Sequence, residues 1–310
     1  MVYETFLEDI KASVQQKLGE HLTVTLEQVL KNNGLLLDGL SIVSPGSPFV
    51  PTIYLNDYYK EAEKGLSLTT IVDRILVLYK EQTFSPANLC NDLQSFESIK
   101  DNVSFKLLNA ADNEILLSDV PHYIFLDLAI VFYLMVSECK KGQMTALIHH
   151  SHLEMWNVKK EVLLPLAKHN TPLLFPVQIV SIENALMDLS GGEACIVFPD
   201  PPPVSLHVLT NQNGINGAVC MLYENVLKNF AARMNDDIII IPSSIHEVLL
   251  TPMKKALSYE DLNEMISLIN QSEVPPEDRL SDHIYHYSKD LDCITIPPDF
   301  SESSERWNPQ

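Results

Sequence analysis

Residues 238–250, IIIIPSSIHEVLL, place serines, a histidine and a glutamate directly after an apolar strand, so this group could carry acid–base or nucleophilic chemistry. A hydrolase would use Ser244 as nucleophile and His246 and Glu247 as acid–base residues. A zinc-protease helix needs a second histidine four residues after the first, where this chain has Leu250. A nucleophile elbow needs glycines around the serine, and none flanks Ser244. The spacing therefore favours a structural role, in which a serine caps the turn after the strand and His246 hydrogen-bonds beneath it.

A second candidate is HHSH at residues 149–152, which places three imidazoles in four residues after an apolar strand. If the strand continues through this stretch, His150 and His152 face the same side and could bind a metal. Zinc would need further ligands, which could come from Glu154, His122 or His169. Histidines at a strand end are more often solvated than metal-bound, so the sequence predicts no metal and no other cofactor.

The loop TNQNGINGA at residues 210–218 follows a strand and precedes a long apolar-striped segment that predicts a helix from about Gly217. Free amides at a helix N-terminus can bind an anion. The loop matches neither the dinucleotide nor the phosphate-loop glycine pattern. A left-handed turn followed by an asparagine N-cap would explain the same residues without a ligand. The candidate ligand-binding residues are Thr210, Asn211, Gly214, Asn216 and Gly217.

Charge and cysteine content narrow the classes of partner and compartment. The chain has 310 residues with 21 basic against 41 acidic side chains, a net charge of −20. Because phosphate backbones are bound through lysine and arginine, nucleic acid is not an expected partner. The charge permits a basic protein partner without requiring one. The five cysteines form no CxxC, and Cys195 and Cys220 lie in apolar sequence, which is typical of reduced cysteines in a cytoplasmic protein.

The longest apolar run, residues 123–136, is not expected to cross a membrane. It has 14 residues where a spanning helix needs about 20, and Asp127 interrupts it, so it predicts a buried strand or helix. The N-terminus has neither a basic stretch nor a continuous apolar stretch of the kind found in signal peptides. We therefore expect a cytoplasmic protein without a membrane partner.

Helical and strand periodicities alternate along the chain without a strict strand–helix repeat. Helices are predicted at 3–18, 56–65, 66–79, 157–170, 217–235 and 258–270. Strands are predicted at 21–30, 37–43, 49–55, 103–109, 114–118, 123–136, 142–150, 193–198, 205–210 and 238–241, with 123–136 and 142–150 as a hairpin. This pattern predicts an α+β fold with mixed, mainly antiparallel sheets, flanking helices and two packed subdomains. The expected divisions are 1–100, 101–272 and an acidic, proline-containing segment at 273–310, which we expect to be loosely ordered or draped over the body.

Four phrases of the sequence, PTIYLNDYYKEAEKGLSL, FLDLAIVFYLMV, VLTNQNGINGAVCMLYENVL and IIPSSIHEVLL, resemble a bacterial family that is carried as a domain of unknown function and is common in gut Firmicutes. The resemblance runs from about residue 25 to about residue 287. It implies a bacterial cytosolic origin and the pairing of residues 210–218 with residues 243–247 as surfaces that define the family. No activity and no catalytic residues come with it.

Taken together, the sequence favours a non-enzymatic binding or protein-interaction module, with an unknown protein or small molecule as partner. The expected surface combines the loop 210–218 with the turn of Ser244, His246 and Glu247, because a strand–helix–strand unit could bring the two to one edge. The alternative is a hydrolase that uses His246 and Glu247 as acid–base residues, with a possible metal from residues 149–152.

Overall fold

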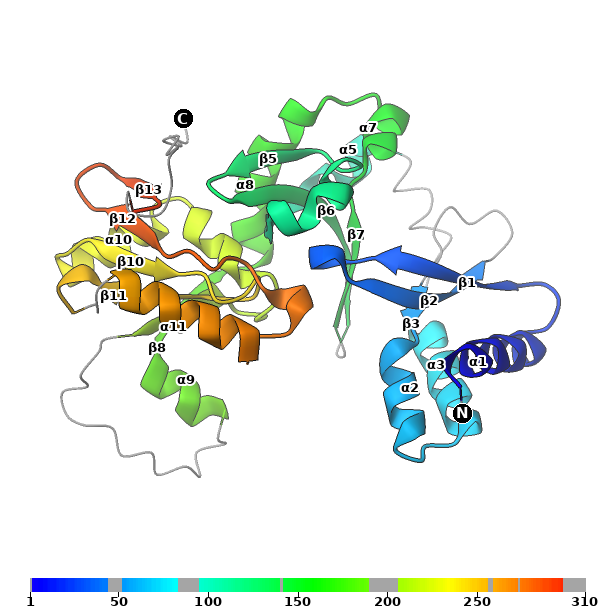
Figure 1. Cartoon of the computed structure of the whole chain (residues 1–310). Helices are drawn as coiled ribbons and strands as arrows, with labels where there is room; N and C mark the ends of the chain where they lie inside the picture. The colour runs from blue at the N-terminus through cyan, green and yellow to red at the C-terminus, as the bar shows by residue number, and fades with distance from the viewer. Residues whose placement is uncertain are drawn as a thin grey trace. The chain divides into compact units, whose positions relative to one another are not determined.

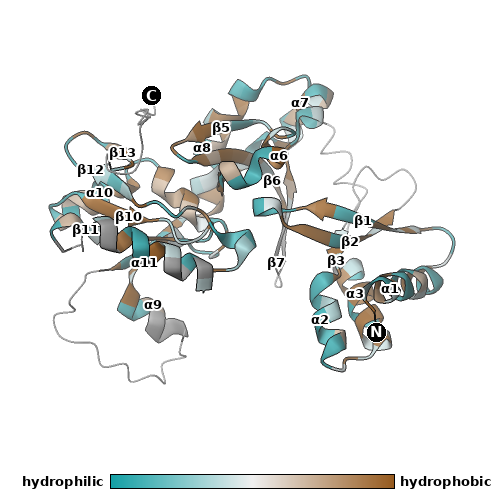
Figure 2. Ribbon diagram, in the orientation of Figure 1, coloured by the Kyte–Doolittle hydropathy of each residue, from teal (hydrophilic) through white to brown (hydrophobic). Residues whose placement is uncertain are grey.

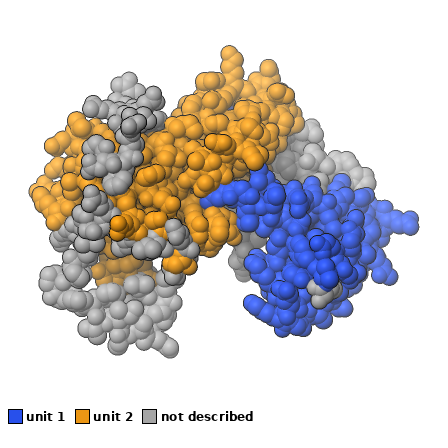
Figure 3. Space-filling model, in the orientation of Figure 1, with its two compact units in different colours: residues 1–99 blue, residues 100–310 orange. Residues whose placement is uncertain are grey.

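A computed structural model of the chain is α+β, as predicted, with helices packed on three mainly antiparallel sheets (Figure 1). The residues described here are 2–43, 52–82, 95–139, 142–189, 206–255, 259–272 and 274–297. The chain divides into two compact units, residues 1–99 and residues 100–310 (Figure 3). Within the described ranges, no helix is both long enough and apolar enough to cross a membrane.

The first unit packs helices on a three-stranded sheet of order β1-β2-β3. Its elements are α1 (Tyr3–Leu18), β1 (Thr23–Leu30), β2 (Leu36–Val43), β3 (Thr52–Tyr54), α2 (Asn56–Glu63) and α3 (Leu68–Gln82), followed by the short α5 (Phe96–Ile99). The four-residue spacing of Phe6, Ile10 and Val14 puts all three on the buried face of α1. They share a core with Leu40 and Ile71, among others, so this unit has a hydrophobic core of its own.

The second unit contains a four-stranded sheet built around one long strand. Its strands are β4 (Val103–Asn109), β5 (His122–Phe125), β6 (Leu128–Cys139) and β7 (Gly142–Leu147), and β6 pairs antiparallel with each of the other three. The predicted hairpin of the last two strands is therefore present. On one face, Leu117 of the short helix α6 (Glu114–Leu117) packs with Leu108 and Ala129. α8 (Leu163–Leu174) packs on β4, where the Thr171 hydroxyl accepts the Phe105 amide N–H at 3.2 Å.

A six-stranded antiparallel sheet of order β13-β12-β10-β11-β9-β8 completes the second unit. Its strands are β8 (Val177–Ser181), β9 (His207–Asn211), β10 (Ile238–Ile241), β11 (Val248–Pro252), β12 (Tyr285–Ser288) and β13 (Cys293–Thr295). The four isoleucines of β10 are all buried, and the strand is brown throughout in Figure 2. α11 (Tyr259–Ser272) covers one face, where Leu262 and Ile266 pack with Ile239 and Ile241. The remaining helices are α7 (His150–Trp156), α9 (Ile182–Leu189) and α10 (Val226–Met234).

One predicted element is wrong in type, and another is divided in two. Residues 114–118 were expected as a strand but contain α6, because Asn109 and Asn113 turn the chain: Asn109 Oδ1 accepts the Asp112 amide N–H at 3.0 Å, and Asn113 Nδ2 donates to the Asn109 carbonyl at 2.8 Å. The expected helix 217–235 is a 3₁₀ helix, η5 (Gly217–Leu222), followed by α10. Asn225 separates them with a left-handed φ of 60°.

Other expectations differ in extent. The apolar run 123–136 forms parts of β5 and β6, joined by a turn in which Leu126 has a φ of 56°. The helix expected over 157–170 begins at Leu163, after the 3₁₀ helix η4 (Lys160–Val162), so Pro165 lies in its first turn. Within the expected C-terminal segment, residues 285–295 supply β12 and β13, which continue the sheet from β10. The strand predicted at 193–198 lies outside the described residues.

Candidate functional site

The connection between β10 and β11 holds the serine, histidine and glutamate that the sequence placed together. Pro242 ends the β10 ladder, and the Ser244 hydroxyl accepts the amide N–H groups of His246 at 3.1 Å and Glu247 at 3.3 Å. Ser244 is only 5% exposed, and its main chain forms an isolated bridge with Arg279. The serine hydroxyl therefore caps the turn.

The loop 210–218 lies directly against this turn. The Asn216 amide N–H donates to His246 Nδ1 at 3.2 Å, and the Thr210 hydroxyl donates to the His246 carbonyl at 2.8 Å. The Ala218 amide N–H donates to the Ile245 carbonyl at 3.2 Å. The two segments that the sequence paired are thus in contact, through the fold's own hydrogen bonds.

Both ring nitrogens of His246 are occupied. Because Nδ1 accepts from the Asn216 amide, the ring proton resides on Nε2, which donates to Asp278 Oδ1 at 3.2 Å. The arrangement fixes the neutral tautomer and holds the imidazole between two segments. For acid–base chemistry, His246 would have to release one of these two partners.

Gly217 explains how the loop approaches the turn so closely. A Cβ at this position would lie 2.1 Å from Thr210 Oγ1, 2.4 Å from the His246 carbonyl oxygen and 2.8 Å from the Asn211 nitrogen. Asn211 closes the loop, since its Nδ2 donates to the Ile215 carbonyl at 2.8 Å and its Oδ1 accepts the Asn213 amide at 3.0 Å. Gly214 has a left-handed φ of 66° and Asn216 one of 53°. The left-handed conformations are present, but the expected α-helix N-terminus at Gly217 is not, since the chain continues as a 3₁₀ helix.

The histidines at 149–152 lie at the start of a helix and not on a strand. His149 precedes α7 and His150 is its first residue, so His150 and His152 do not share a strand face. His149 Nδ1 lies 2.7 Å from Asp119 Oδ2, the His149 amide donates to His152 Nδ1 at 3.0 Å, and His152 stacks on Trp156. Burial lowers the pKa of His152. Across the described ranges, no group of three or more histidine, cysteine, aspartate or glutamate side chains is placed to bind a metal ion.

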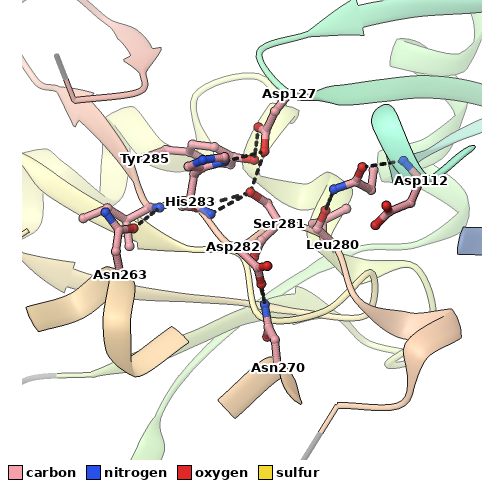
Figure 4. A network of polar contacts seen from close by, with 11 residues as sticks. Asp112, Asp127, Asn263, Asn270, Leu280, Ser281, Asp282, His283 and Tyr285 are labelled. Carbon is pink, nitrogen blue, oxygen red and sulfur yellow. Dashed lines mark hydrogen bonds and ion pairs between the residues drawn. The ribbon is translucent and has the colours of Figure 1, made fainter. Parts of the chain in front are cut away.

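Asp127, in the β5–β6 turn, lies at the centre of a network of hydrogen bonds, although the sequence marked it only as an interruption of an apolar run (Figure 4). Asp127 Oδ2 accepts from the Ser281 hydroxyl at 2.6 Å and lies 3.2 Å from His283 Nδ1, while Oδ1 accepts from the Tyr285 hydroxyl at 2.6 Å. Burial raises the pKa of Asp127, but the hydrogen bonds from His283, Ser281 and Tyr285 outweigh burial and leave it lowered. The hydrogen bond to Asp127 raises the pKa of His283.

The same network joins the two sheets of the second unit. Asn109, at the end of β4, donates from Nδ2 to the Leu280 carbonyl at 3.1 Å, and Asn270 of α11 donates to Asp282 Oδ1 at 2.7 Å (Figure 4). An aspartate that orients a histidine is also the geometry of a general base. The neighbouring hydroxyl, however, is that of Ser281, which is 2% exposed and donates to the carboxylate. The geometry is that of a structural link between the β5–β6 turn and the segment that leads into β12.

A family model matches residues 3–289 and describes a family of unknown function, DUF5688. The chain belongs to DUF5688. The match contains the turn at Ser244, the loop 210–218 and the Asp127 network. No curated protein and no solved structure matches the chain.

This member of DUF5688 also has a shallow groove of mixed polarity between α6 and β5 that sequence reasoning did not find. The groove encloses about 490 Å³, is open to solvent and is lined by Ala110, Ala111, Glu114, Leu117, Ser118, His122 and Ile124. Ile124 is 54% exposed, and Ile115, next to the lining Glu114 in α6, is 75% exposed. Beneath them lies the small core that contains Leu117. Sequence reasoning missed the groove because the apolar pattern of residues 114–118 predicts a strand, whereas the groove requires these residues to be helical.

Proposed function

We propose that this member of DUF5688 is a non-enzymatic protein-interaction module whose docking surface is the groove between α6 and β5. The observation that carries the proposal is the groove itself, with Ile124 in its lining and the exposed Ile115 beside it. A single exposed apolar side chain is ordinary on a protein surface, but two large exposed aliphatic side chains at one groove offer a partner protein an apolar contact.

The hydrogen bonds of the β10–β11 turn support the non-enzymatic part of the proposal. Ser244 and His246 use their polar atoms to hold the turn and the loop 210–218 in place. We therefore propose a structural role for that surface. The hydrolase alternative with His246 and Glu247 would require the imidazole to lose a partner before it met a substrate.

The openness of the groove supports a protein partner over a small molecule. Small ligands are usually bound in hollows that bury most of their surface, whereas a groove open to solvent suits side chains that a second protein brings with it. We place the protein in the bacterial cytoplasm, on the basis of the family resemblance and of the free thiols of Cys220 and Cys293.

The proposal can be tested with a displayed library of random 12-residue peptides, selected on the full-length protein and then screened against Ile124→Glu. We expect enriched peptides that bind the parent and lose binding to Ile124→Glu, because a buried charge in the groove costs desolvation energy. Leu173→Glu is the matched control, since Leu173 is 69% exposed on α8. Failure to enrich any peptide whose binding depends on Ile124 would contradict the proposal.

A further inference from the structure

The groove lies in a stretch of the chain that has no lysine or arginine. Between Lys106 and Lys140 there is no lysine or arginine, whereas the acidic residues there are Asp112, Glu114, Asp119, Asp127 and Glu138. Glu114 lines the groove, and the exposed Asp112 follows the lining Ala111. Asp119, which follows the lining Ser118, is exposed and paired with His149 at 2.7 Å. The groove thus combines an apolar floor with negative charge on the side of α6.

One lysine approaches the groove from the β5 side. Lys160 Nζ lies 4.5 Å from the centre of the Tyr123 ring and donates to the His122 carbonyl at 3.1 Å. Within the described sheet β5 pairs only with β6, so it is an edge strand. A lysine on one of its carbonyls interferes with the addition of another strand. A partner would therefore dock through its side chains and not through main-chain pairing.

Resting on the interaction role proposed above, we propose that the groove binds a cationic amphipathic segment of another protein. An aliphatic side chain of that segment would lie between Leu117 and Ile124. A lysine or arginine beside it would pair with Glu114, with Asp112 adding to the attraction. Charged groups at a groove margin select the partner and its orientation more than they add affinity.

Charge also favours this partner over two other occupants, a second copy of the chain and the chain's own segment 298–310. A second copy of the chain carries the same net charge of −20. The chain's own segment 298–310 has three acidic residues, Asp299, Glu302 and Glu305, against Arg306 alone. Both would bring like charge to Glu114 and Asp112, which opposes association, whereas a basic segment is attracted over the whole approach.

The experiment uses the full-length protein and three synthetic helical peptides with the same leucine face. The polar positions next to the leucines are lysine in the first peptide, glutamine in the second and glutamate in the third. Fluorescence anisotropy would give the affinity of each at low and at physiological ionic strength. We expect the lysine peptide to bind about tenfold tighter than the glutamine peptide at low salt, with the glutamate peptide weakest and the difference shrinking as salt screens it.

Substitutions then place the effect at the groove. Glu114→Lys should remove the preference for the lysine peptide, and Ile124→Glu should weaken all three peptides. Glu264→Lys, at an exposed position on α11, makes the same change of net charge away from the groove and should leave the preference in place.

Each outcome separates the partner's chemistry from the docking role. If the glutamine or glutamate peptide binds as tightly as the lysine peptide while still depending on Ile124, the cationic partner is wrong and the docking surface stands. If Glu264→Lys reduces the preference for the lysine peptide as strongly as Glu114→Lys does, the preference comes from the net charge of the protein alone. The inference is then overturned. If no peptide binds in an Ile124-dependent way, the inference of a cationic partner is contradicted. The selection from the random peptide library then tests independently whether the groove is a docking surface.

Discussion

His246 uses every polar group it has to hold neighbouring segments. Its amide, carbonyl, Nδ1 and Nε2 are bonded in turn to Ser244, Thr210, Asn216 and Asp278. A residue with this set of contacts connects three stretches of chain that are distant in sequence. We therefore expect His246 to contribute to the free energy of unfolding, and a substitution can measure that contribution.

His246→Ala should lower the free energy of unfolding by about 1–3 kcal/mol, because the Asn216 amide and the Asp278 carboxylate each lose a partner. Ser244→Ala should lower it by a similar amount, since two amide N–H groups lose their acceptor. The measurement is urea denaturation followed by circular dichroism, with Ser243→Ala as the neighbouring control. Full stability in both variants would contradict the structural role and favour the hydrolase alternative.

Gly217→Ala should be more damaging than an ordinary glycine substitution. The Cβ of the alanine would overlap the His246 carbonyl oxygen and the Asn211 nitrogen. Both are main-chain atoms, so they cannot move away by a change of side-chain rotamer. We expect a loss of about 1–3 kcal/mol, the range for overpacking in a tight site. Gly214→Ala is the control, because it has a φ of 66° with nothing within 4 Å and should cost only about 1 kcal/mol. Equal losses at the two glycines would mean that the loop is not packed as described.

Among the elements, apolar periodicity predicted those with one clear buried face. It located α1, whose buried residues Phe6, Ile10 and Val14 recur at helical spacing. The β6–β7 hairpin was predicted instead from a continuous apolar run, and residues 128–134 of β6 are buried without a break. Apolar periodicity failed where side chains that bind the main chain decide the local structure, as Asn109 and Asn113 do before α6. The contact between the loop 210–218 and His246 could be anticipated from the strand–helix–strand order. The groove could not, because it requires residues 114–118 to be helical where their apolar pattern predicts a strand. The Asp127 network could not either, because it joins residues that are more than 150 positions apart in sequence.

The link between the β5–β6 turn and the segment that leads into β12 should make stability depend on pH. The lowered pKa of Asp127 means that its contribution is complete above its ordinary value of 3.8 and is lost as pH falls through the folded-state pKa. The raised pKa of His283 means that its contribution is complete below 6.5 and is lost as pH rises through the folded-state pKa. The full contribution of the pair therefore falls between about pH 4 and pH 6.5.

Asp127→Asn should cost most stability in that window and less on either side of it. The difference from the parent should be on the order of 2 kcal/mol at pH 5.5, which includes the weaker hydrogen bonds from Ser281 and Tyr285. Denaturation curves from pH 3 to pH 9 would show this. In the same variant, the pKa of His283 measured by nuclear magnetic resonance should fall towards 6.5. An unchanged His283 pKa would show that the two side chains are not paired.

For the molecule as a whole, each compact unit has its own core. One cluster of buried residues, which includes Phe6, Leu40 and Ile71, lies entirely within residues 1–99. Separate clusters around Leu117 and around Ile239 lie within residues 100–310. A unit with a continuous core of its own can unfold on its own, so we propose that residues 1–99 form an independent domain.

The distribution of tryptophan makes that proposal measurable in the intact chain. Both tryptophans, Trp156 and Trp307, follow residue 100, so tryptophan fluorescence reports on the second unit, while far-ultraviolet circular dichroism reports on helices of both units. If the units unfold separately, the two signals should give different denaturation midpoints. Ile71→Ala, which should cost the first unit about 2–5 kcal/mol, would shift part of the dichroism transition and leave the fluorescence transition in place. Ile241→Ala in β10 should shift the fluorescence transition together with the part of the dichroism transition that comes from the second unit. Coincident transitions that Ile71→Ala moves together would show instead that the chain unfolds as one cooperative unit.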